Sequence, residues 1–143
     1  MEVRVNKIGR VFTCHLTQGE EILAEISNLA RKYQIKGASF FVLGAIGEGK
    51  ITTGFIRDRE KDSKPIQDLG LKREVLGIGS LSWSAKKPEA IREAVPWEGP
   101  QPYPHLHLVF GPDVGVEEKE ILVGHLQKGL ASGVTVLLYE HLE

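Results

Sequence analysis

The sequence predicts an α+β domain in which a mostly antiparallel sheet packs against one main amphipathic helix. One long segment repeats apolar residues at helical spacing, whereas residues 11–16, 38–46, 72–84 and 134–142 show strand-type alternation or short apolar runs. The chain has 143 residues, of which 41% are hydrophobic and 26% are charged. This length and balance are typical of one compact soluble domain, so we expect residues 1–143 to form a single unit.

The first quarter of the chain predicts strand and then helix. Residues 1–16 hold one or two strands, the clearer of them at residues 11–16. Thr17-Gln18-Gly19-Glu20 has the form of a capping box, in which Thr17 and Glu20 satisfy each other's backbone amides. We expect the helix to follow directly and to end at Gly37. Its apolar stripe consists of Ile22, Leu23, Ile26, Leu29, Ala30 and Tyr33.

The second quarter predicts a glycine-rich hairpin. Residues 38–46 are too apolar for a strand with one wet face, so we expect them at the centre of the sheet. Residues 51–56 then pair with them across a turn at Gly47-Glu48-Gly49. Residues 57–71 are polar and predict a loop, and residues 72–84 return to strand.

Proline dominates the third quarter. Residues 86–104 contain five prolines, which cannot continue a helix or a strand ladder, although residues 88–94 predict a short helix opened by proline. After the next strand, residues 111–120 predict a polar connection. Residues 129–133 predict a turn, and residues 134–142 the closing strand.

Two histidines alternate with apolar residues in Tyr103-Pro104-His105-Leu106-His107-Leu108-Val109-Phe110. In a strand, His105 and His107 share one face about 6–7 Å apart, and both imidazoles can reach one ion at about 2.0–2.1 Å. His125, in Gly124-His125-Leu126, offers a third ligand. An isolated His-x-His is more often two polar positions on a half-buried strand than a metal site. The surrounding residues are therefore needed to choose between these two interpretations. The opposite, core face carries Leu106, Leu108 and Phe110.

The order of motifs resembles that of the plants and prokaryotes conserved domain, or PPC domain, over nearly the whole chain. The His-Leu-His strand and the Gly-His-Leu segment are its most specific parts. The matching elements are Leu16-x-x-Gly19-Glu20, residues 38–44, Arg73-Glu74-Val75-Leu76-x-x-x-Ser80, His105-Leu106-His107, Gly124-His125-Leu126 and Glu140.

The resemblance implies a compact domain that assembles as a homotrimer. Some bacterial members are similar in carrying zinc on a histidine cluster, which corresponds here to His105, His107 and His125. It also implies that Arg73 and Glu74 lie near a subunit interface or beside the site. Plant members carry an AT-hook, but no Arg-Gly-Arg-Pro core occurs in this sequence, so the chain is similar to the prokaryotic type.

Two departures from the family pattern affect the site. Val123 replaces the first glycine of the usual Gly-Gly-His-Leu. The segment 86–104 is longer than the short turn that often precedes the histidine strand. If this insertion folds over the cluster, it either completes the site or blocks it.

Three classes of function follow. The favoured one is a trimeric binding module that holds a divalent metal, zinc above all, or a small ligand at the histidines. A second is a metalloenzyme that activates water at the open position of the metal, with Glu74 or Glu140 as the acid or base. Nothing in the sequence places either glutamate beside the histidines, so we assign no catalytic residue. The third is a DNA-associated regulator, against which the net charge of −1 counts.

Composition also indicates the cellular compartment of the protein. Cys14 is the single cysteine, so no internal disulfide can form and a reducing interior is the natural compartment. The first five residues are charged and alternating, unlike a signal peptide. No apolar run approaches the roughly 20 residues that span a bilayer. We therefore expect a cytoplasmic protein without membrane contact.

Overall fold

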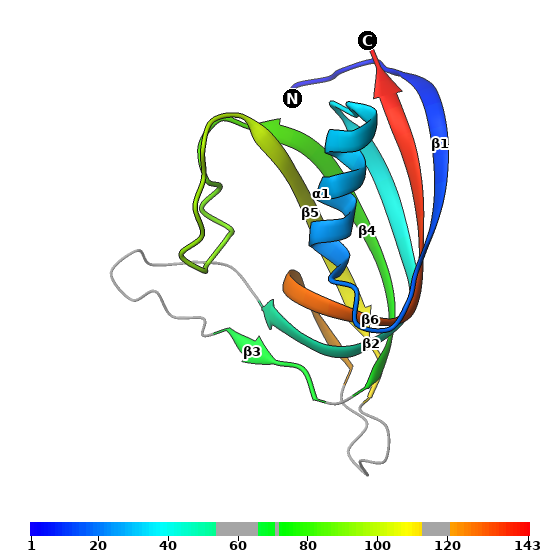
Figure 1. Cartoon of the computed structure of the whole chain (residues 1–143), viewed down its shortest axis with the longest axis vertical. Helices are drawn as coiled ribbons and strands as arrows, with labels where there is room; N and C mark the ends of the chain where they lie inside the picture. Colours follow the sequence, from blue (N-terminus) through cyan, green and yellow to red (C-terminus); the bar gives the residue numbers. More distant parts are fainter. Residues whose placement is uncertain (54–65, 71, 113–120) are drawn as a thin grey trace.

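The computed structural model describes residues 1–53, 66–70, 72–112 and 121–143. These residues form one helix and a six-stranded sheet that curves around it (Figure 1). The elements are β1 (Lys7–Leu16), α1 (Ile22–Tyr33), β2 (Ala38–Thr52), β3 (Gln67–Asp68), β4 (Arg73–Ser84), β5 (Gln101–Phe110) and β6 (Leu122–Leu142).

Every strand pairing is antiparallel, which confirms the predicted sheet type. The order is β1-β6-β5-β4-β2-β3, and β6 also pairs with β2, so β2, β4, β5 and β6 close into a ring. One edge of β6 follows β2 along almost its whole length. Its other edge pairs with β5 over residues 122–125 and with β1 over residues 134–142. Strand β6 therefore changes partner along its length and leaves a gap beside β5.

The loop before α1 fills part of this gap. The amide of Gly19 donates to the carbonyl of Ala131 at 2.9 Å, and the amide of Ala131 donates to the carbonyl of Glu20 at 2.8 Å. The Glu21 carboxylate accepts from the amide of Gly129 at 2.9 Å. These bonds fix the start of α1 against the edge of β6 that faces away from β2, where neither β5 nor β1 pairs with residues 129–131.

Helix α1 is confirmed in place and face, but its ends differ from the prediction. The Glu20 carboxylate does accept from the Thr17 amide at 2.7 Å, yet Glu21 is the N-cap and accepts from the amide of Ala24 at 2.6 Å. The helix ends at Tyr33, before Gly37, because Gln34 takes the left-handed conformation with φ 53°. Its side-chain amide donates to a carbonyl of the last turn at 2.7 Å, which helps a non-glycine residue to hold this position.

Two predicted turns are wrong. Strand β2 runs through residues 47–49, and β6 runs through residues 129–133, where turns were expected. Register shifts between Gly44 and Ile51 bend β2 without ending its pairing to β6. Gly44 has φ 139°, and a Cβ there would overlap the carbonyl oxygen of Gly133. The glycines therefore allow bulges and a close approach of two strands. Of the strand predicted at residues 51–56, residues 54–56 lie outside the described part.

The proline-rich segment forms no helix, contrary to the prediction for residues 88–94. It makes one turn, in which the amide of Ile91 donates to the carbonyl of Pro88 at 3.1 Å. Two other backbone groups of the segment have a side-chain partner, since Gln127 donates to the carbonyl of Ala90 at 2.8 Å and accepts from the amide of Arg92 at 3.1 Å. The predicted loop at 57–71 contains the two-residue strand β3; residues 57–65, 71 and 113–120 lie outside the described part.

The core lies between α1 and the sheet. Leu106, Leu108 and Phe110 are buried, as the alternation in β5 predicts. The buried helical residues Ile22, Ile26 and Ala30 belong to the same cluster. No helix among residues 1–53, 66–70, 72–112 and 121–143 combines the length and apolar character needed to cross a membrane.

Candidate metal centre

The pairing of β5 with β6 brings the three histidines together. His107 lies directly opposite His125 in this antiparallel pair, and residues so paired point to the same face. His105 precedes His107 by two residues and shares that face. We call this side of the sheet, opposite the buried Phe40 and Leu106, the outer face. The fold thus places imidazoles from two segments on one small area of the outer face.

The geometry of the cluster is close to that of a metal site. One ligand nitrogen from each of His105, His107 and His125 lies within 4.8 Å of the other two. The Nε2 atoms of His105 and His107 are 3.0 Å apart, and the three ring centroids lie 4.7–5.3 Å from one another. A tetrahedral zinc with bonds of about 2.0–2.1 Å holds its ligand nitrogens roughly 3.3 Å apart. Rotation of the side chains by about an ångström at the nitrogens would bring the most distant pair into that range.

Burial keeps two of these imidazoles uncharged. Desolvation is the main cause that lowers the pKa of His125 to about 4, and the charges of the neighbouring His105 and His107 contribute to the same shift. Desolvation, followed by the charge of His107, also lowers the pKa of His105. A neutral imidazole has the lone pair that a metal needs, so at neutral pH these side chains are ready to ligate.

The donor set is three imidazoles. Within the described residues, no aspartate, glutamate or cysteine joins the three histidines in the group that can hold an ion. The Tyr103 ring stacks on His105, with centroids 5.7 Å apart and planes 13° apart, and so limits how that imidazole can turn. Three protein ligands and a fourth, open position are the arrangement of catalytic and ligand-binding zinc sites.

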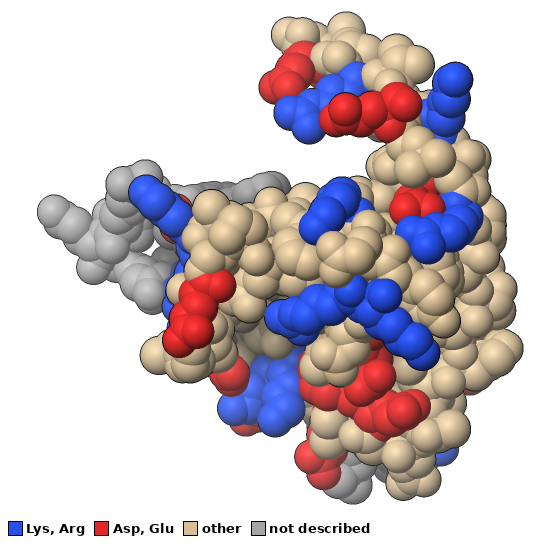
Figure 2. Space-filling model, turned by 45° about the horizontal axis from the view of Figure 1, so that its top comes forward, with Lys and Arg blue, Asp and Glu red and all other residues tan. Residues whose placement is uncertain are grey.

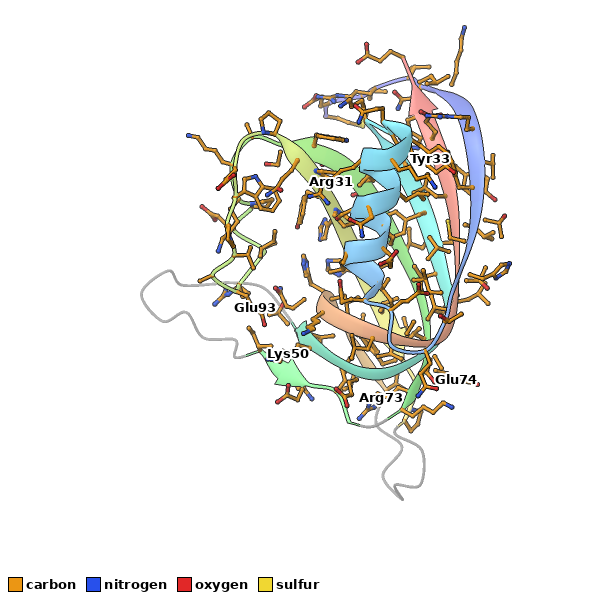
Figure 3. The ribbon with its side chains drawn as sticks, viewed as in Figure 1. Arg31, Tyr33, Lys50, Arg73, Glu74 and Glu93 are labelled. Carbon is orange, nitrogen blue, oxygen red and sulfur yellow. The ribbon has the colours of Figure 1, made fainter. Side chains whose placement is uncertain are left out.

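Arg73 and Glu74 are the first two residues of β4 (Figure 3), whereas the histidines of β5 lie opposite Ile78 and Ser80. Ile78 is the residue of β4 opposite His107, and the four residues from Glu74 to Ile78 span about 13 Å of strand. Arg73 is half-buried and donates from Nη1 to the carbonyl of Gly111 at 2.9 Å, while Glu74 is exposed. The structure therefore does not bring this pair beside the histidines.

Glu140 is paired with Arg10 and does not join the histidine cluster. It lies on the buried face, where Arg10 donates to its two carboxylate oxygens from Nε and Nη2, each at 2.8 Å. The hydrogen bond from Arg10 lowers the pKa of Glu140 to about 2. Of the other histidines, His15 pairs with Thr135 at 3.1 Å and His141 with Ser39 at 3.0 Å. None of these groups joins the cluster.

The outer face around the cluster is apolar, a feature that was not predicted from the sequence. Strand register places Phe41, Ile78, His107 and His125 in one row across four strands. The next row along the strands consists of aliphatic residues, and Ile121 directly precedes β6. These apolar residues are 42–65% exposed: Phe41, Leu43, Leu76, Ile78, Val109, Ile121 and Val123. Their alternation with buried positions in β2, β4 and β5 was the signal that could have shown a sheet apolar on both faces.

Together, the described residues define a small antiparallel domain with one core helix and a three-histidine cluster on its outer face. The chain belongs to the family of the Plants and Prokaryotes Conserved (PCC) domain, whose profile matches residues 3–141. This confirms the resemblance found in the sequence.

Solved structures show the same fold. A plant- and prokaryote-conserved protein of Pyrococcus horikoshii is 24% identical with a TM-score of 0.77, over 100% of this chain and 86% of that one. A protein of Archaeoglobus fulgidus described as metal-containing is 20% identical with a TM-score of 0.73, over 99% and 86%. A candidate DNA-binding protein of Ralstonia eutropha is 18% identical with a TM-score of 0.64, over 90% and 76%. A search of curated proteins gave no match.

Proposed function

We propose that this protein is a homotrimeric PPC-type module that binds a divalent metal at His105, His107 and His125. The convergence of three ligand nitrogens within 4.8 Å is the observation that carries the proposal. The lowered pKa values of His105 and His125 support it, because they reduce competition from protons. The likeness in fold to the metal-containing Archaeoglobus protein points the same way.

Zinc is the metal that this donor set suits best. Imidazole nitrogens favour zinc among the available divalent ions, whereas calcium and magnesium prefer oxygen ligands. Three ligands leave a position for a small molecule, which makes a binding role the simplest use of the site. An enzymatic role would need an acid or base beside the open position. Glu74 lies about 13 Å along β4 and Glu140 is paired with Arg10, so neither candidate supports it.

The apolar outer face supports assembly of the trimer. At the exposures given above, the seven apolar residues present roughly 700 Å² to solvent, more than the largest patch of about 300–600 Å² on a typical monomer. A stable interface buries about 800 Å² on each partner. A second copy of the chain on this face would therefore cover an area of the expected size, next to the histidine cluster.

DNA binding is the alternative suggested by the Ralstonia protein. The net charge of −1 gives it little electrostatic support, because phosphate contacts dominate such affinity. In Figure 2, Lys and Arg side chains lie among Asp and Glu on the face shown and form no separate basic field. The single cysteine among 143 residues suits the cytoplasmic setting that we propose.

Metal analysis tests the main proposal. Protein purified without a histidine tag should bind close to one zinc per chain when titrated against a chromophoric chelator. His107→Ala should lower zinc affinity by at least a hundredfold. His15→Ala is the matched control, because His15 is exposed and contacts Thr135, outside the cluster. Equal zinc affinity in the His107→Ala and wild-type proteins would refute the site.

A further inference from the structure

A cavity of about 270 Å³ opens beside His125. Three parts of the chain that are far apart in sequence form its walls: the first half of α1, residues 91–97, and the point where β5 and β6 separate. Most of its lining is apolar, with Leu23 on the helix side and Ile91, Val95 and Trp97 on the side of the proline-rich segment. The cavity is a consequence of β6 leaving β5 after the His107–His125 pair and continuing along β2.

The cavity and the histidine cluster share residues. His125 lines the cavity and is also one of the three candidate ligands. Tyr103 lines it as well, and its ring stacks on His105. A molecule seated in the cavity would therefore lie directly against the His125 imidazole and the Tyr103 ring.

The wall formed by the proline-rich segment is held by specific bonds. Gln127 binds two backbone groups of residues 90 and 92, as described above. The Trp97 indole donates to the carbonyl of Ser84 at 3.0 Å. Lys50 of β2 and Glu93 lie 3.8 Å apart and face each other in Figure 3. The insertion thus adds a shaped wall beside the cluster, and within the described residues it adds no ligand to it.

We propose that this cavity holds the apolar body of a small monocarboxylate whose carboxylate occupies the open position of the metal. The inference rests on the proposed metal function. Three neutral imidazoles leave the double charge of a zinc ion uncompensated, so an anionic fourth ligand is favoured. The apolar walls favour a hydrocarbon body. A cavity of about 150 Å³ accepts benzene, so about 270 Å³ accommodates one aromatic ring with a short side chain.

Cobalt(II) reports both on metal binding by the histidines and on a carboxylate bound at the open position, because its visible absorption changes with its ligands. The first step is a cobalt titration of the wild-type chain, which tests metal binding by itself. The second step adds phenylacetate or acetate to the cobalt form. Phenylacetate should shift the visible bands with half-saturation at a concentration at least tenfold below that of acetate.

A substitution that fills the cavity provides the structural test. Ala24 lines the cavity from the helix and is exposed, so Ala24→Leu adds volume there and replaces no candidate ligand. This variant should keep its cobalt affinity within twofold and lose the preference for phenylacetate. Ala85→Leu, at an exposed position outside the cavity, is the matched control and should keep both. Val95→Trp fills the opposite wall and serves as a second variant if Ala24→Leu folds poorly.

The outcomes separate the two proposals. Failure of the wild-type chain to bind cobalt would refute the metal function and this inference with it. Cobalt binding without any preference for phenylacetate over acetate would refute the inference alone. Retention of the preference in both filled variants would also refute it, because the apolar body would then lie elsewhere.

Discussion

Removing the charge of Glu140 should destabilise the fold by an amount that depends on pH. Glu140 is buried and accepts three hydrogen bonds from Arg10, two from the guanidinium and one, at 3.1 Å, from the backbone amide. Arg10 also donates to the carbonyl of Tyr33 at 2.8 Å, so the pair joins β1 to β6 and to the end of α1. Glu140→Gln keeps the size of the side chain and removes the charge.

The pKa of Glu140 sets the size and sign of the effect. Its pKa is about 2 in the folded chain, against an ordinary value of 4.5. At about 1.4 kcal/mol for each pH unit, this difference gives at most about 3 kcal/mol of stabilisation at neutral pH. The Arg10 side chain is 52% exposed, and screening by water reduces the expected loss in Glu140→Gln to about 1–2 kcal/mol. Because the folded pKa is the lower one, the stabilisation is full above about pH 4.5 and disappears as the pH falls towards 2.

Urea denaturation of both proteins between pH 7 and pH 2.5 measures this difference. The protein concentration must be the same throughout, because the stability of an oligomer depends on it. Glu89→Gln, at an exposed position, controls for the loss of one negative charge. A free-energy difference between wild type and Glu140→Gln that stays constant from pH 7 to pH 3 would refute the reasoning.

Three further predictions concern assembly, metal binding and packing. Ile78→Asp should shift sedimentation equilibrium from trimer towards monomer, since Ile78 is 64% exposed on the outer face; an unchanged trimer would exclude this face as the interface. Zinc affinity should fall with fewer than three protons per ion between pH 6.5 and 5.5, because His125, with a pKa of about 4, stays neutral there and the pKa of His105 is also lowered. A slope of three, measured by chelator competition, would contradict this. Gly79→Val should destabilise the chain by about 3 kcal/mol or more, because a Cβ would overlap the Phe40 ring. An unchanged thermal midpoint would contradict this and show that the Phe40 side chain can move to make room.

The sequence predicted features that depend on local periodicity. The stripe of α1 and the alternation in β5 each repeat at the spacing of their own element, so the face that is buried can be found without knowing the neighbours. The same alternation placed His105 and His107 on one side of a strand. The family motifs then indicated His125 as the third member of the cluster, which lies directly opposite His107 in the structure.

The sequence could not predict features that depend on which strands meet. Gly47 and Gly129 look like turn residues in the sequence, but both lie inside long bent strands, because bulges allow β6 to pair with β2 on one edge and with β5 and then β1 on the other. The place of Glu140 depends on Arg10, which is 130 residues away in the chain.

The division between the two sources of information has a physical reason. Local pattern determined the helix, the strand faces and the residue types that can hold a metal, because side-chain direction repeats within each element. Tertiary structure alone decided that His107 and His125 lie opposite each other, that Gln127 holds the proline-rich segment, and that a cavity opens beside the cluster. These contacts arise when β6 leaves β5, and the register of two distant strands is set by packing of the whole core and not by either segment alone.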